Sequence, residues 1–297
     1  MPRPTTPRAR RASQWPINEQ ALVSDRRAIG FFDSGVGGLT VLREVTRRLP
    51  AESTIYIGDN ARAPYGPRTD DEVKRFSAEC LDELASRDVK AIVVACNTSS
   101  AVALPDLRLR YNMPLLGVVR PGATAAALAT RNRRVGVIGT AATIRSHAYF
   151  QAIKEEDPFV EVLEQATPDL VPLVEAGRLD GPLVEDVVRR SIAAITDSDR
   201  EPDTLLLGCT HYPLLAPIFR AIVGPEVAVI DTATATASAL AHLLEMHDLN
   251  APVGDTASHV QLTTGDVAAF DLIAERLFGP DFARVEPVAL ARAASQA

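Results

Sequence analysis

Two short apolar runs, each followed at once by a small residue and a cysteine, constrain the fold of this chain most strongly. The first is Ala91–Ala101 (AIVVACNTSSA) and the second is Thr204–Leu215 (TLLLGCTHYPLL). An apolar run that breaks abruptly into polar residues is typical of a buried parallel strand. Ligands of open α/β sheets bind beyond the carboxyl ends of the strands, so Cys96 and Cys209 are predicted to face a ligand. Their matching contexts indicate two similar halves that face one pocket.

Strand and helix patterns alternate along the rest of the chain. Further apolar runs predicted to be strands lie at residues 28–32, 54–59, 114–119, 134–140, 160–165 and 227–231, and helices are predicted at 146–153, 182–195 and 234–247. Thr69 and Glu72 form a capping box that opens another helix, with Cys80 on its apolar face as a small hydrophobic side chain. The alternation predicts an α/β fold of two similar doubly wound domains with mainly parallel sheets and an active site in the cleft between them.

The length of 297 residues also favours two domains. We expect a flexible basic extension at residues 1–27, where arginines outnumber acids. The first domain is predicted to comprise residues 28–119 plus 233–280, and the second residues 120–232. Residues 281–297 are predicted to be a frayed tail.

Composition and charge exclude several functional classes. A formal net charge of −7 argues against a general polyanion binder, so nucleic acid is not expected as a partner. Three cysteines in a chain of this length do not suggest a secreted disulfide framework. The chain shows neither a run as long as a membrane span nor an apolar signal segment, so we expect a cytoplasmic protein with no membrane partner.

Two other predicted strand ends carry polar loops. The first strand runs into Asp33–Gly38 (DSGVGG), where a glycine-rich turn precedes a helix and backbone N–H groups are able to approach an anion. This turn matches neither the dinucleotide nor the Walker pattern. The second polar loop, Ala63–Gly66, follows the strand at residues 54–59 and is expected to hang over the same crevice.

The two cysteines leave several chemistries open. A redox pair would more often show C-x-x-C spacing, and a zinc site would need ligands besides His211. A single nucleophilic cysteine with His211 as its base would suit acyl transfer, but it gives Cys96 no role. Two thiols on opposite sides of a substrate carbon would support two-base proton exchange. In that reaction one thiolate removes an α-proton while the other thiol returns a proton to the opposite face.

The motif series resembles that of the cofactor-independent glutamate racemases. The motifs follow the family order from about residue 29 to residue 279, and they are Asp33–Gly38, Pro64–Gly66, Cys96–Thr98, Gly139–Thr140 with Thr143, Gly208–Pro213 and Thr264–Asp266. Related aspartate, hydantoin and malonate-type enzymes share the cysteine strands, whereas the P-Y-G and C-T-H-Y-P motifs together resemble the glutamate branch. Ser99 stands where an alanine is usual, and the basic N-terminal extension lies outside the shared pattern.

The resemblance implies a cofactor-independent isomerase, without a metal, that interconverts L- and D-glutamate. It implies a cytoplasmic homodimer that supplies D-glutamate for peptidoglycan synthesis and thus for the cell wall. Cys96 would act on the D-isomer and Cys209 on the L-isomer. A free thiol with a pKa of about 8.5 is mostly protonated at neutral pH, so each cysteine needs an activating neighbour. The catalytic neighbours that the resemblance implies are Asp33, His211 and Glu175.

The resemblance also implies a set of substrate-binding residues, namely Asp33, Ser34, Pro64, Tyr65, Gly66, Asn97, Thr98, Thr140, Thr143, Thr210 and His211. Ser34, Asn97, Thr98 and Thr210 would receive the α-carboxylate and ammonium groups. The Tyr65–Gly66 loop and the hydroxyls of Thr140 and Thr143 would receive the γ-carboxylate. Two rival interpretations stay open: another racemase or a decarboxylase on the same scaffold, and a non-catalytic binding protein whose basic arm docks on a partner.

Overall fold

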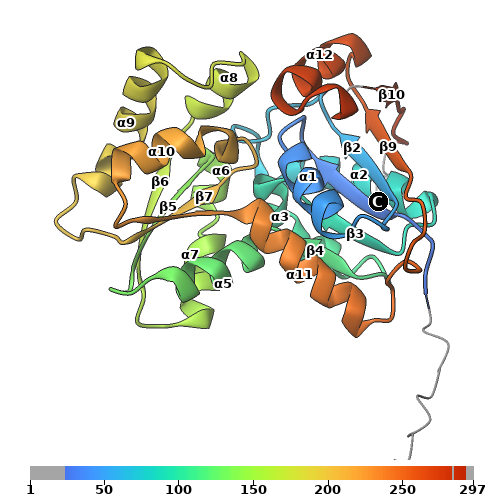
Figure 1. Ribbon diagram of the computed structural model, residues 1–297, viewed down its shortest axis with the longest axis horizontal. Coiled ribbons are helices and arrows are strands. Elements are labelled where there is room, and N and C mark those ends of the chain that lie inside the picture. The colour runs from blue at the N-terminus through green and yellow to red at the C-terminus, as the bar shows by residue number, and fades with distance from the viewer. Residues whose placement is uncertain (1–23, 283, 292–297) are drawn as a thin grey trace, which may run out of the picture.

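Two parallel sheets lie side by side in the computed structural model, which describes residues 24–282 and 284–291 (Figure 1). The strands of the first sheet are β1 (Ile29–Asp33), β2 (Thr54–Gly58), β3 (Ala91–Val94), β4 (Leu115–Gly117), β9 (His259–Thr263) and β10 (Val285–Pro287). Those of the second sheet are β5 (Arg134–Gly139), β6 (Glu161–Ala166), β7 (Thr204–Gly208) and β8 (Ala228–Asp231). Neighbouring strands pair in parallel in both sheets. The predicted fold class is confirmed.

Helices connect the strands, because a parallel pair needs a crossover connection. They are α1 (Leu39–Arg48), α2 (Asp70–Ser86), α3 (Asn97–Val102), α4 (Leu104–Leu107), α5 (Val119–Ala129), α6 (Ala141–Arg145), α7 (Ala148–Glu156), α8 (Leu170–Glu175), α9 (Pro182–Thr196), α10 (Ala216–Val223), α11 (Thr232–Met246) and α12 (Val267–Phe278), with short 3₁₀ helices at Tyr212–Leu215 and Pro280–Phe282. The capping box of Thr69 and Glu72 opens α2 as predicted. Within residues 24–282 and 284–291, no helix combines the length and apolar character needed to cross a bilayer.

The strand order of each sheet reverses beside one of the two cysteines. In the first sheet, ordered β10-β9-β2-β1-β3-β4, the chain leaves β1 toward β2 and returns to β3 on the other side. In the second sheet, ordered β6-β5-β7-β8, it leaves β5 toward β6 and returns to β7. Such switch points open a crevice beyond the strand ends. Cys96 follows β3 and Cys209 follows β7, so both cysteines stand at switch points.

Both faces of each sheet are covered, which explains the unbroken apolar runs in the sequence. Successive residues of β1, such as Phe31 and Phe32, belong to different hydrophobic clusters and are fully buried. The same alternation holds in β7, where Leu206 packs into one cluster and Leu205 and Leu207 into the other. Each such side chain stabilises the fold by roughly 1.5–3 kcal/mol relative to its exposed state.

Helix α11 spans the junction between the two halves of the molecule (Figure 1). It packs against α1, which covers the first sheet, and against α5, which follows the first sheet and packs on the second. Its first turn is fixed by Asp231, whose carboxylate accepts a hydrogen bond of 2.9 Å from the backbone N–H of Thr234. The two sheets are therefore connected by packing as well as by the chain itself.

The two ends of the chain differ in part from the sequence-based expectation. Residues 1–23 of the basic extension lie outside the described residues. Asp25, expected to be part of that extension, has defined contacts: its N–H donates to the Asn250 carbonyl at 3.0 Å and its carbonyl accepts from Lys90 at 2.7 Å. The frayed tail expected from residue 281 is wrong for Val285–Pro287, which pairs with β9 as strand β10. The Asp271 carboxylate on α12 accepts from the N–H groups that lead into this strand.

Candidate active site

A cavity of about 440 Å³ lies where the carboxyl ends of the two sheets face each other, and both Cys96 and Cys209 line it. The other lining residues come from both halves of the molecule and are Ser34, Gly35, Ala63, Pro64, Tyr65, Gly66, Pro67, Asn97, Thr98, Thr140, Ala141, Thr167, Pro168, Val171, Pro172, Glu175, Thr210 and His211. Both cysteines are free thiols, and they are 4% and 5% exposed. A disulfide between them is therefore not present, and both sulfurs face the same enclosed space.

Cys96 stands at the start of α3 and is a protonated thiol at neutral pH. Its sulfur accepts a hydrogen bond of 3.5 Å from the N–H of Ser99, and its thiol points toward the Ser34 hydroxyl at 3.6 Å. Burial and the nearby charge of Asp33 raise the pKa of Cys96 to about 11, although the contacts with Ser99 and Ser34 oppose that rise. Cys96 is thus suited to deliver a proton.

Cys209 has a different set of neighbours, a histidine and a carboxylate in series. The Cys209 sulfur lies 3.7 Å from Nδ1 of His211, and Nε2 of His211 lies 3.2 Å from a carboxylate oxygen of Glu175. Burial lowers the pKa of His211, but the contacts with Cys209 and Glu175 outweigh it and raise that pKa to about 10. His211 is consequently an imidazolium at neutral pH, and it places a positive charge beside the Cys209 sulfur.

Asp33 is fully buried and does not itself line the cavity. Its carboxylate accepts hydrogen bonds from the N–H of Gly35 at 2.9 Å and from the Thr210 hydroxyl at 3.4 Å. Burial raises the pKa of Asp33, while the charge of His211 and these hydrogen bonds counteract the rise. Asp33 therefore joins the turn after β1 to the turn that carries Cys209, and it acts on Cys96 through its charge.

The glycine turn after β1 allows the two halves of the molecule to approach closely. A Cβ atom at Gly37 would lie 2.4 Å from the Thr210 hydroxyl oxygen and 2.6 Å from the His211 ring. The Thr40 hydroxyl donates to the Thr210 carbonyl at 3.0 Å across the same contact. Only a residue without a side chain fits here, which explains the glycine at position 37.

Three threonine hydroxyls form a cluster across the cleft. Thr98 lies 2.9 Å from Thr140 and 3.4 Å from Thr143, and the latter two hydroxyls are 2.9 Å apart. Thr98 belongs to the half of the molecule that holds the first sheet, whereas Thr140 belongs to the half that holds the second sheet and caps α6 by accepting from the Thr143 N–H. Thr98 and Thr140 line the cavity, while Thr143 is fully buried behind them. The expected contact of Thr143 with a substrate is thus indirect in this arrangement.

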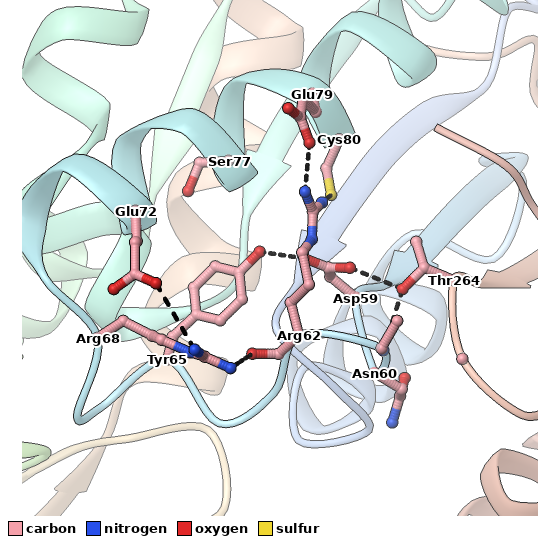
Figure 2. A network of polar contacts seen from close by, with 12 residues as sticks. Asp59, Asn60, Arg62, Tyr65, Arg68, Glu72, Ser77, Glu79, Cys80 and Thr264 are labelled. Carbon is pink, nitrogen blue, oxygen red and sulfur yellow. Dashed lines mark hydrogen bonds and ion pairs between the residues drawn. The ribbon is translucent and has the colours of Figure 1, made fainter. Parts of the chain in front are cut away.

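The Ala63–Gly66 loop closes one end of the cavity, as its position after β2 suggested. The Gly66 carbonyl accepts a hydrogen bond of 3.2 Å from the N–H of Ala142, and a Cβ atom at Gly66 would lie 3.0 Å from Cβ of Thr140. The Tyr65 hydroxyl donates to Asp59, a residue that does not line the cavity (Figure 2). The loop thus contacts the second half of the molecule through its backbone.

Sequence reasoning missed Tyr149 and the segment that carries Thr167 and Val171. Tyr149 belongs to α7, and its hydroxyl accepts a 2.6 Å hydrogen bond from the Asn97 side-chain amide. Among the residues that the structure describes, the other amide atom of Asn97, Oδ1, is buried without a hydrogen-bond partner. Thr167 and Val171 line the cavity beyond β6. The strand-end rule that singled out the cysteines also applies after β6, whereas no local signal marks Tyr149.

Comparisons with known proteins agree with this geometry. The family model described as Asp/Glu/Hydantoin racemase matches residues 29–240. The glutamate racemase of Exiguobacterium sibiricum is 45% identical over 248 residues, which cover 84% of this chain and 91% of that protein.

Solved structures of glutamate racemases are also similar over most of the chain. Isoform RacE1 from Bacillus anthracis has a TM-score of 0.84 and 40% identity, with 90% of this chain and 98% of that chain covered. The enzyme of Francisella tularensis, solved in complex with D-glutamate, has a TM-score of 0.81 and 32% identity, with 89% and 98% covered. Two cysteines at matching switch points and a similarity of this extent lead to one conclusion: the chain belongs to the Asp/Glu/Hydantoin racemase family, on the branch of the glutamate racemases.

Proposed function

We propose that the protein interconverts L- and D-glutamate by cofactor-independent proton transfer between the α-carbon and two cysteines, Cys96 and Cys209. The observation that carries this proposal is that two free thiols from different sheets line one cavity. Single-nucleophile chemistry would leave one of them without a function. The D-glutamate complex of the Francisella relative supports glutamate as the substrate.

In the L-to-D direction, the Cys209 thiolate removes the α-proton and the Cys96 thiol delivers its own proton to the opposite face. One C–H bond breaks and another forms, so a proton passes from carbon to the Cys209 sulfur while another passes from the Cys96 sulfur to carbon. The imidazolium of His211 lies 3.7 Å from the Cys209 sulfur and would stabilise negative charge that forms on it during the reaction. In the reverse direction the two thiols exchange roles.

The weakly acidic α-proton requires electrostatic stabilisation of the carbanion. Polar groups around the two cysteines, from Ser34, Asn97 and Thr210, are positioned before the substrate arrives and would receive its α-carboxylate and ammonium groups. The cavity is enclosed by protein, where such interactions are stronger than in water. The positive charge of His211 adds to this field and stabilises the negative charge that builds up near the α-carbon.

The far end of the cavity would receive the second carboxylate of glutamate. Gly66 and Thr140 line the cavity there, and the Thr98 hydroxyl lies 2.9 Å from that of Thr140, so we assign Thr98 to this carboxylate rather than to the α-carboxylate that the resemblance implies. A site built for a carboxylate leaves buried donors unpaired when the ligand lacks that group, and such an analogue is rejected strongly. We therefore propose selection of glutamate over alanine and glutamine.

Incubation with L-glutamate in deuterated water tests the reaction directly. Loss of optical rotation together with deuterium at the α-carbon is expected, because the proton delivered to the product comes from a thiol that exchanges with solvent. Release of carbon dioxide would instead identify a decarboxylase, and turnover of aspartate but not glutamate would identify a different racemase. Protein that leaves both rotation and deuterium content unchanged would refute the proposal and favour a binding function.

We also propose the wider context that the resemblance implies, a cytoplasmic homodimer whose product supplies peptidoglycan synthesis. The domain division into residues 28–119 plus 233–280 and residues 120–232 is likewise a proposal. It is supported by the two separate sheets. Light scattering in solution tests the dimer. Limited proteolysis of the two connections between the domains, near residues 119–120 and 232–233, tests the division.

A further inference from the structure

Asp59 is a fully buried carboxylate at the end of β2 whose two oxygens are both occupied (Figure 2). One oxygen accepts a hydrogen bond of 2.6 Å from the hydroxyl of Thr264. The other accepts from Nε of Arg62 at 2.6 Å and from the Tyr65 hydroxyl. None of these bonds is needed by the proton transfer proposed above, yet a buried charge is retained only where it is paired and hydrogen-bonded.

The Arg62 guanidinium, which does not line the cavity, holds this carboxylate. It also donates to Glu79 on α2, and its carbon atom lies 4.3 Å from the centre of the Phe76 ring. The backbone carbonyl of Arg62 accepts a hydrogen bond of 3.1 Å from the Arg68 side chain. The segment that begins at Asp59 is thereby tied to α2 at several points.

Tyr65 connects Asp59 to the wall of the cavity, because its hydroxyl donates to Asp59 and the residue itself lines the cavity. It is buried between Phe32 and Phe76, with ring centres 6.2 Å and 5.7 Å away. A ring packed on both sides cannot swing its hydroxyl toward the cavity without losing these contacts and the bond to Asp59. Tyr65 thus holds in place a loop whose residues line the cavity.

We propose that Asp59 is a positioning residue, which acts through Tyr65 to fix the Ala63–Gly66 loop where the second carboxylate of the substrate binds. This inference rests on the proposed function, because that function assigns the second carboxylate to this loop. The Asp59 N–H also donates to the Asp33 carbonyl at 2.9 Å, so the same residue ties the loop to the turn after β1. A loop held in this way loses little freedom when the substrate binds, which favours affinity.

The test is the substitution Tyr65→Phe, which removes one hydroxyl and keeps the packed ring. Tyr111→Phe is the matched control, since the Tyr111 hydroxyl likewise donates to a carboxylate, Asp82 on α2, at 2.6 Å, and Tyr111 does not line the cavity. For Tyr65→Phe we expect the KM for glutamate to rise by about three- to tenfold with kcat within about twofold of the wild type, as for lost ground-state binding. The control should leave both constants unchanged.

A second variant, Thr264→Val, removes the hydrogen bond to the other oxygen of Asp59. It tests the inference if Tyr65→Phe does not fold. It should raise the KM in the same direction. A purely structural role would lower thermal stability in either variant without separating KM from kcat. If the wild type is active and the folded variants keep its KM, this inference alone is overturned. If the wild-type protein is inactive toward glutamate, the proposed function is overturned with it.

Discussion

The hydroxyl of Tyr149 accepts a hydrogen bond of 2.6 Å from the side-chain amide of Asn97, the residue that follows Cys96. The same tyrosine ring lies against Gly208, the residue before Cys209, where a Cβ atom would come within 2.9 Å of the ring. One side chain of α7 therefore contacts a neighbour of each cysteine. Because Cys96 and Cys209 belong to different sheets, Tyr149 sets their relative position.

Removal of that hydroxyl should slow racemisation without removing either thiol. Tyr149→Phe leaves the Asn97 amide without its partner in a buried place, which costs about 1–3 kcal/mol. We expect kcat/KM to fall by about tenfold, because an Asn97 side chain that has lost its partner no longer holds a fixed position beside Cys96, and about 1.4 kcal/mol of lost transition-state stabilisation lowers a rate tenfold. Because two enantiomers have equal free energies, the fall must be the same from L- and from D-glutamate. Polarimetry from both isomers checks this, with Tyr111→Phe as the control, and an unchanged kcat/KM contradicts it.

The two cysteines of the cavity should each be indispensable, and the third should not. In Cys96→Ala or Cys209→Ala one face of the α-carbon loses its proton carrier, so we expect racemisation to drop below detection. Cys80→Ala is the matched control, because this buried thiol lies on α2 and does not line the cavity. Its effect should be confined to a modest loss of thermal stability. Full activity in either of the first two variants is incompatible with two-base exchange.

The strand ends that carry Cys96 and Cys209 can be predicted from sequence because parallel strands covered on both faces are uniformly apolar and stop abruptly. The capping box of α2 is equally visible, since its partners are three residues apart. The role of Tyr149 cannot be predicted, because its partner Asn97 lies 52 positions earlier in the chain. Contacts of this kind form only when the two halves of the molecule pack against each other.

Two local differences have similar causes. The helix predicted at residues 146–153 is interrupted at His147, whose φ of 52° is left-handed, and α7 starts only after it. The carboxylate of Glu164 on the adjacent strand β6 lies 2.6 Å from the His147 ring and holds this residue. Strand β10 carries little periodic signal in its three residues, and it forms because it adds to the edge of a finished sheet.

The alkaline side of the stability profile should depend on His211. Its pKa is raised from 6.5 to about 10, so the folded protein binds this proton more tightly than the unfolded chain does. The stabilisation is fully present below pH 6.5 and is lost as the pH rises through about 10. We expect the thermal midpoint of the wild type to fall over this window more steeply than that of His211→Asn. Parallel profiles in differential scanning calorimetry would show that the histidine is not the group responsible.

Glu175 should set the pH at which His211 loses its imidazolium proton during catalysis. It is one of the two groups that raise the pKa of His211, so Glu175→Gln should lower that pKa. The alkaline limb of the kcat/KM profile should then move to lower pH, while the acidic limb stays in place. Glu185→Gln, at an exposed position on α9, is the control for the loss of one negative charge. An alkaline limb that does not move would remove Glu175 from the activation of Cys209.

Glutamate should stabilise the folded protein, because the cavity is enclosed between the two sheets and is absent from the unfolded chain. A ligand at one hundred times its Kd stabilises by about 2.7 kcal/mol, which raises the thermal midpoint by several degrees. The measurement is best made on Cys96→Ser, which should bind glutamate without interconverting the isomers during the scan. Glutamine fills a similar volume but brings a neutral amide to the Gly66 end of the cavity, so its shift should be much smaller. Equal shifts from glutamate and glutamine would mean that this end of the cavity does not recognise a carboxylate, and the absence of any shift with saturating glutamate would mean that the cavity does not bind it.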